Sequence, residues 1–155
     1  MDDLVLKFFK IFSRFEFALK EASYLKGPEN GNASPNWDLF VKDFKAKYQI
    51  SQASKEAVSY LFSEPPKKQK VVKGSHDKLS TYWEPMNFSE NTPELKKLVD
   101  IITTIRNNLF HGGKYGEREW DNEDRVKKLL ESSIFVLNDW LELNEDINFY
   151  FHDFA

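Results

Sequence analysis

Apolar residues recur every three or four positions along five stretches of the chain, which is the pattern of helices with one buried face. Residues 3–26 form the first stretch, and residues 51–63 form a short third one. The predicted buried positions are Leu4, Phe8, Phe12, Phe15, Leu19 and Ala22; Trp37, Phe40, Val41, Phe44 and Tyr48; Ala57, Val58 and Leu61; Leu95, Leu98, Val99, Ile102, Ile105 and Leu109; and Val126, Leu130, Ile134, Leu137 and Leu141.

Residues that start or stop helices stand between these stretches. Proline at the first helical position and a polar residue before it favour a helix start, whereas glycine favours an end. The predicted starts are Ser34-Pro35, Thr92-Pro93-Glu94 and either Asp121 or Asn122. The predicted ends are Gly27-Pro28, Pro65-Pro66 and Gly112-Gly113.

Residues 67–92 lack this periodicity, and we interpret them as a long ordered loop with a short extended piece around Val71-Val72. Tyr82, Trp83, Met86 and Phe88 are expected to anchor the loop. The fold expected from these patterns is all-α: one domain over residues 1–155, built as a bundle of about four to five helices. The aromatic tail, residues 148–154, is expected to pack back on the domain or on a second subunit.

Composition narrows the possible functions. The chain has 155 residues, 41% of them hydrophobic, which is enough for one core. Cysteine is absent, so disulfides, a thiol nucleophile and cysteine zinc sites are excluded. No signal peptide and no apolar run of about 18 residues is present, so we expect a cytoplasmic protein without a membrane partner.

The formal net charge of −3 argues against a binder of long duplex DNA, which usually presents a strongly basic face. Lysines nevertheless gather at Lys67, Lys68, Lys70 and Lys73. This cluster either lines a path for phosphates or is a solvated run of charge, and the sequence leaves both readings open.

The fourth stretch ends in an arginine, an asparagine and a histidine. Arg106 falls within the apolar stripe, where a guanidinium needs a partner because losing its water costs several kcal/mol. Glu16 projects among the aromatic rings of the first helix and is the candidate partner. His111 falls in the last turn before the glycines, where the negative end of the helix dipole favours imidazolium.

Together these residue types suit attack of a ribose 2′-hydroxyl on the neighbouring phosphate, because histidine moves protons and arginine binds phosphate. Asn107 lies one turn before His111 and would orient the ring or the phosphate. Arg106 and His111 lie about 140° apart on an ideal helix. Either the helix deforms, the arginine swings round, or the two residues act across a subunit interface. A purely structural reading also stands, with Arg106 paired to Glu16 and His111 capping the helix.

Residues 106–112 resemble the signature of the HEPN superfamily, all-helical domains named for higher eukaryotes and prokaryotes nucleotide-binding. That signature is an arginine, usually followed by asparagine, and a histidine a few residues later near the end of a helix. Four residues separate Arg106 from His111. Phe15-Glu16, Trp37-Asp38 and Glu64-Pro65-Pro66-Lys67-Lys68 are also similar to segments of stand-alone bacterial members.

The resemblance implies a metal-independent endoribonuclease without a cofactor, acting as a toxin or phage-defence effector. Two copies would form a composite site, leaving a 2′,3′-cyclic phosphate and a 5′-hydroxyl on cleaved RNA. Arg106 and His111 would be catalytic with help from Asn107, while Glu16 would orient the arginine. The implied partners are RNA, a second copy of the chain, and an antitoxin or defence-system protein. The alternative is a non-catalytic module that binds nucleotide or RNA or mediates an interaction.

Further assignments concern individual residues. The predicted RNA-binding lysines are Lys67, Lys68, Lys70, Lys73 and Lys114. In toxins controlled by a nucleotidyltransferase antitoxin, a modified tyrosine lies two residues after the histidine. Here Gly113 occupies that place, so Tyr115 is the candidate for regulatory modification. His152 has no second histidine at ligand spacing, so no metal site is predicted.

Overall fold

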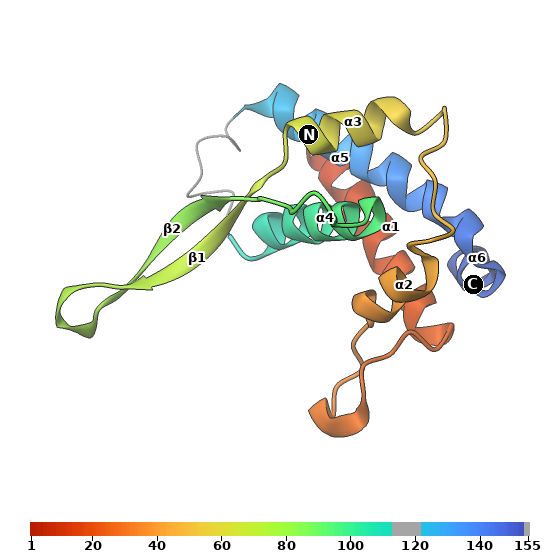
Figure 1. Cartoon of the computed structure of the whole chain (residues 1–155), viewed down its shortest axis with the longest axis horizontal. Coiled ribbons are helices and arrows are strands. Elements are labelled where there is room, and N and C mark those ends of the chain that lie inside the picture. Colours follow the sequence, from red (N-terminus) through yellow and green to blue (C-terminus); the bar gives the residue numbers. More distant parts are fainter. Residues whose placement is uncertain (113–121, 154–155) are drawn as a thin grey trace.

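The computed structural model describes residues 1–112 and 122–153. Within these ranges the chain forms six α-helices and one two-stranded antiparallel sheet (Figure 1). The elements are α1 (Asp2–Glu21), η1 (Pro28–Asn30), α2 (Trp37–Phe44), α3 (Lys55–Ser63), β1 (Lys67–Lys73), η2 (Ser75–Asp77), β2 (Leu79–Pro85), α4 (Glu94–Phe110), α5 (Glu123–Asp139), η5 (Trp140–Leu143) and α6 (Glu145–His152), where η marks a 3₁₀ turn.

The predicted helical stripes form the core. Every predicted apolar position of α4 is buried, as is every one from Val126 to Leu141. In α1 the same holds from Phe8 to Leu19, while Leu4 and Ala22 at its two ends are partly buried. Trp140 is fully buried, with its ring centroid 5.7 Å from that of Phe40. The core therefore lies between α1, α4 and α5, with α2 and α3 closing it (Figure 1).

The described part of the C-terminal tail packs back on the domain, which is one of the two predicted alternatives. It forms α6, which lies against α1 and buries Ile147 and Phe151. Arg14 of α1 donates a hydrogen bond from Nη2 to the carbonyl oxygen of Phe151 at 2.5 Å, and its guanidinium also lies over the Phe151 ring. The tail therefore contributes to the core of this chain, while Phe149 on its other side is 57% exposed.

Two predicted helix starts differ from the structure. Asn36 caps α2 by accepting a hydrogen bond from the Leu39 amide at 3.0 Å, so the Ser34-Pro35 start was wrong. Pro35 instead forms an isolated antiparallel bridge with Leu25. Before α4, the Thr92 hydroxyl pairs with Ser89 at 2.9 Å and does not cap the helix. Asn122 caps α5 as predicted.

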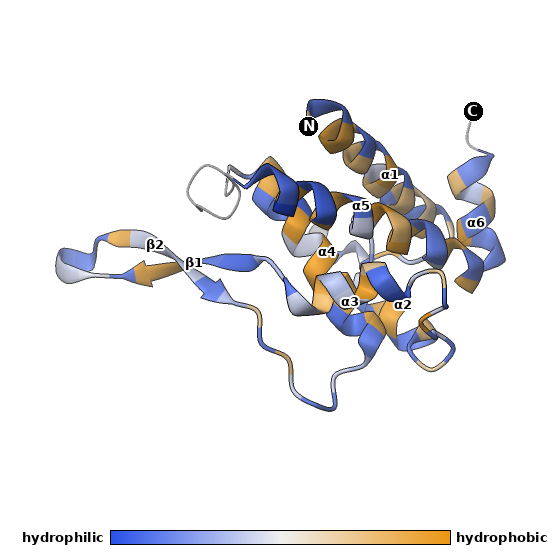
Figure 2. Cartoon of the chain, turned by 90° about the horizontal axis from the view of Figure 1, so that it is seen from above, coloured by the Kyte–Doolittle hydropathy of each residue, from blue (hydrophilic) through white to orange (hydrophobic). Residues whose placement is uncertain are grey.

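The all-α prediction was wrong because residues 67–85 form a β-hairpin. Figures 1 and 2 show it extending away from the helices as an arm. A strand with one buried face alternates polar and apolar residues, but nearly all residues of β1 and β2 are exposed on both faces, so no alternation arose. Met86 and Phe88 pack against the core as predicted, whereas Tyr82 is 45% exposed and anchors nothing.

Two side chains of the helices hold the base of the hairpin. Arg125 of α5 donates from Nη2 to the carbonyl oxygens of Glu64 at 3.3 Å and Pro65 at 3.2 Å. Asn108 of α4 donates from Nδ2 to the carbonyl oxygen of Lys67 at 3.0 Å. An isolated two-stranded hairpin is only marginally stable in water, so the hairpin depends on contacts of this kind with the helices. The same contacts fix the point at which β1 leaves the helices.

Within residues 1–112 and 122–153, none of the helices combines the length and the apolar composition needed to cross a lipid bilayer.

Candidate functional site

The end of α4 presents Asn107 and His111 to solvent. The helix ends at Phe110, and Gly112 follows with a φ of 79°, a left-handed conformation that glycine adopts without strain. The His111 amide donates to the Asn107 carbonyl oxygen at 2.9 Å, which closes the last turn. Because the two residues are four apart, their exposed side chains lie on the same face of the helix.

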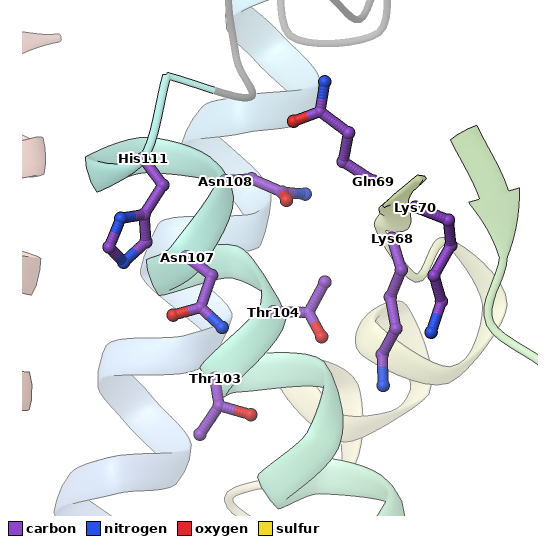
Figure 3. Close-up of a pocket in the computed structure, with 8 residues that line it drawn as sticks. All are labelled: Lys68, Gln69, Lys70, Thr103, Thr104, Asn107, Asn108 and His111. Carbon is purple, nitrogen blue, oxygen red and sulfur yellow. The ribbon is translucent and has the colours of Figure 1, made fainter. Parts of the chain in front are cut away.

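A polar pocket of about 300 Å³ lies beside this face, between α4 and β1. Figure 3 shows His111 and Asn107 on the helix, with Lys68 and Lys70 projecting from the strand on the opposite side. Its lining contains three basic side chains and no carboxylate, which suits an anion. The lining residues are Lys68, Gln69, Lys70, Thr103, Thr104, Asn107, Asn108 and His111.

The donors available to a ligand follow from the existing hydrogen bonds. Thr103 and Thr104 donate their hydroxyl protons to the carbonyl oxygens of Val99 and Asp100 in the preceding turn, at 2.7 and 2.6 Å. Lys68 and Lys70 form no ion pair with any residue of 1–112 or 122–153. The ammonium groups and the His111 ring are therefore the principal ligand donors.

Arg106 reaches the pocket through Asn107. Its Nη1 donates to Asn107 Oδ1 at 3.0 Å, and its guanidinium carbon lies 5.8 Å from the centroid of the Phe12 ring. This bond occupies the amide oxygen of Asn107 and leaves the NH₂ group as a donor. In Figure 3 that nitrogen is on the side of Lys68. Arg106 is half-buried and does not itself line the pocket.

Glu16 lies behind the arginine. It is half-buried and accepts a hydrogen bond from Trp37 Nε1 at 3.4 Å. Burial raises the pKa of Glu16, while the positive charge of Arg106 and the Trp37 bond act in the opposite direction. The two charges therefore attract each other, but the ion pairs within the described residues do not include a direct Glu16–Arg106 contact.

The structure separates the predicted RNA-binding lysines. Lys68 and Lys70 line the pocket. Lys67 meets α4 through its backbone carbonyl group, which accepts the Asn108 hydrogen bond. Lys73 lies at the far end of β1 and pairs with Asp77 at 3.3 Å. Lys114 and Tyr115 lie outside the described residues.

Comparisons of the chain with models of known protein families, with curated proteins and with solved structures find no match. A proposed function therefore rests on the site itself and on the motif of residues 106–112.

Asn108 is a positioning residue that the sequence did not single out. Its side chain is 5% exposed, and its bond to Lys67 fixes β1 against the last turns of α4. An asparagine at a buried helical position needs a hydrogen-bond partner. This requirement was the only indication in the sequence that Asn108 makes a specific contact. The partner itself, a backbone carbonyl 41 residues away in the chain, was not predictable from the spacing.

The other histidines do not join this pocket. His76 lies exposed in the hairpin turn with a φ of 59°, and His152 is exposed at the end of α6. Among the described residues, histidine, aspartate and glutamate side chains form no group of three that would hold a metal ion.

Proposed function

We propose that the chain is a metal-independent endoribonuclease whose pocket between α4 and β1 binds the scissile phosphate of RNA. The supporting observation is that His111 and Asn107 share this pocket with Lys68 and Lys70, which arrive from a distant segment. The pocket thus combines an imidazole, a side chain that can accept and donate a proton, with cationic donors for a phosphate. The resemblance of residues 106–112 to the HEPN signature points to the same chemistry.

In this proposal, His111 accepts the proton of a ribose 2′-hydroxyl as its oxygen bonds to the adjacent phosphorus. The bond from phosphorus to the 5′-oxygen then breaks, and a protonated group supplies a proton to that oxygen. The products are a 2′,3′-cyclic phosphate and a 5′-hydroxyl. Lys68, Lys70 and the Asn107 amide stabilise the charge that develops on the phosphate oxygens.

We propose that a second copy of the chain completes the site. One copy offers a single histidine in the pocket, and its Arg106 is turned toward Asn107 and Phe12. Next to His111, Phe110 packs on Phe9 of α1 with ring centroids 5.1 Å apart, although these side chains are 41% and 46% exposed. An exposed aromatic pair beside the site is suited to a two-fold interface that brings two pockets together.

The experiment is incubation of pure protein with RNA in the presence of EDTA, with His111→Ala as the matched variant. Wild type is expected to produce fragments ending in a cyclic phosphate, and the variant to be slower by about 100-fold or more, the typical contribution of general acid–base catalysis. Wild-type protein that never cleaves, or a variant that cleaves equally well, would overturn the proposal.

Subunit mixing tests the composite site separately. If the arginine of one copy acts with the histidine of the other, a mixture of Arg106→Ala and His111→Ala proteins regains roughly a quarter of wild-type activity, because half the dimers are mixed and keep one of two sites. Two inactive variants that stay inactive when mixed, despite exchange of subunits, would restrict catalysis to a single copy.

The position of Arg106 favours a second candidate, a module that binds RNA or nucleotide without cleaving it. An arginine outside the pocket leaves phosphate binding to Lys68 and Lys70 and provides no direct contact from the guanidinium. Affinity for RNA without turnover, in wild type as in His111→Ala, would identify this function.

A role as a toxin or phage-defence effector, with an antitoxin or defence-system partner, rests on the HEPN resemblance alone. Expression in a bacterial host should arrest growth with the wild-type gene and not with the His111→Ala gene. Equal growth with both at equal protein levels would count against this role.

A further inference from the structure

The register of the hairpin determines which side chains share the face of the pocket. Lys68 pairs with Glu84, Lys70 with Tyr82, and Val72 with Ser80. Directly paired residues of antiparallel strands project from the same face, with Cβ atoms about 5 Å apart. Because Lys68 and Lys70 line the pocket, Tyr82 lies on this same face, directly opposite Lys70 and farther out along the arm than Lys68.

Tyr82 is an aromatic side chain held in the open. It is 45% exposed, and its neighbour Trp83, which projects from the opposite face, is half-buried. A tyrosine ring that packs on no core presents a flat apolar surface to solvent next to a lysine. An exposed aromatic ring beside cationic groups is the combination with which proteins bind single-stranded nucleic acid.

Charge also distinguishes the arm from the rest of the chain. Residues 67–85 contain five lysines against two carboxylates, Asp77 and Glu84, which gives +3. The whole chain carries −3, so the remaining residues carry −6. A polyanion is therefore attracted to the arm and repelled by most of the other surface, within the screening distance of about 8 Å at physiological salt.

We propose that the face of Lys68, Lys70 and Tyr82 binds an unpaired segment of RNA that continues from the pocket. The lysines contact successive phosphates, and one base stacks on the ring of Tyr82. This inference rests on the proposed function and adds its substrate class, single-stranded RNA. A duplex does not fit, because its bases are stacked on one another and offer no free face to a side chain.

Two carboxylates border this path. Glu84 lies opposite Lys68, and together with Asp100 it lines a neighbouring pocket that both lysines also touch. Asp100 is already neutralised by an ion pair with Lys96 at 2.8 Å. The phosphates are therefore expected on the side of His111 and Asn107, where the lining contains no carboxylate.

The test measures binding of a short unstructured RNA, and of the same RNA annealed to its complement, to His111→Ala protein, which removes cleavage from the assay. Single-stranded RNA should bind more tightly than the duplex. Adding Tyr82→Ala should weaken single-strand binding by between about 5-fold and 150-fold, the range found for loss of one stacked base. Tyr82→Phe, which keeps the ring, should restore it.

Leu79→Ala is the matched control. Leu79 is 65% exposed on the same strand but pairs with Lys73 on the opposite face, so its loss should leave binding unchanged. Equal affinity of Tyr82→Ala and its parent, or equal affinity for strand and duplex, would overturn this inference even if wild type cleaves RNA. Absence of both cleavage and RNA binding in wild type would instead overturn the proposed function.

Discussion

Asn108 connects the hairpin to the motif helix, and replacing it with aspartate tests how the site is assembled. In the wild type, Asn108 Nδ2 donates a hydrogen bond to the carbonyl oxygen of Lys67 at 3.0 Å. Aspartate has nearly the same shape, but its ionised side chain has no donor for this oxygen. The variant therefore loses the bond and places a negative charge against a carbonyl oxygen. The expected result is a hairpin released from α4 while the helical core stays folded.

The magnitude follows from the burial of Asn108. A typical hydrogen bond contributes about 0.5–1.5 kcal/mol, and a buried group left unsatisfied costs about 1–3 kcal/mol. Because Asn108 is only 5% exposed, we take the larger range. A change of about 1–3 kcal/mol in local opening accelerates amide exchange by roughly 5-fold to 150-fold.

Amide hydrogen exchange along β1 and β2 provides the measurement. Their amides should exchange faster in Asn108→Asp, and RNA cleavage should fall because Lys68 and Lys70 no longer stand opposite His111. Asn138→Asp is the matched control: Asn138 donates at 3.0 Å to Ile134 within its own helix, so the same chemical change leaves the hairpin alone. Unchanged exchange in the hairpin of Asn108→Asp would show that the Asn108–Lys67 bond does not hold the hairpin against α4.

Three further variants test the buried carboxylate, the charge beside the lysines and the turn after α4. Burial raises the pKa of Glu16, so the native state holds this proton more tightly than the unfolded state does, and the free energy of unfolding falls as pH rises through the region just above 4.5. Glu16→Gln should remove this decline in thermal melts recorded across that pH range. The same pH dependence of the melting temperature in both proteins would contradict a raised pKa for Glu16. Glu84→Gln should tighten RNA binding, most strongly at low salt, because the repulsion between this carboxylate and the phosphates disappears; weaker binding would place the phosphates elsewhere. Gly112→Ala should cost about 1–2 kcal/mol of stability through its φ of 79° alone, since an added Cβ meets no atom within 4 Å, whereas an unchanged melting temperature would show that this turn relaxes freely.

The sequence was most informative where side chains are buried. Leu98, Ile102 and Ile105 follow the helical period because each contacts the core, so the period revealed α4 and its neighbours. The hairpin gave no comparable signal. Val71 and Val72 lie on opposite faces of β1 and are 65% and 44% exposed, so neither face is buried and no alternation of polar and apolar residues marks the strand.

The candidate site was predictable in part for the same reason. Asn107 and His111 share a face through local helix geometry, which spacing alone determines. The approach of Lys68 and Lys70 depends on the Asn108–Lys67 bond between segments distant in the sequence, so a lysine-rich stretch was visible but its position was not. Arg106 was expected among apolar residues, yet its long side chain reaches sideways to Asn107.

The most direct test of the central claim is the RNA product formed by wild-type and His111→Ala proteins in EDTA. Wild-type protein should produce fragments with 2′,3′-cyclic phosphate and 5′-hydroxyl ends, and the variant should react at least about 100-fold more slowly. Equal cleavage by both proteins, or fragments with 5′-phosphate ends, would contradict the proposed mechanism.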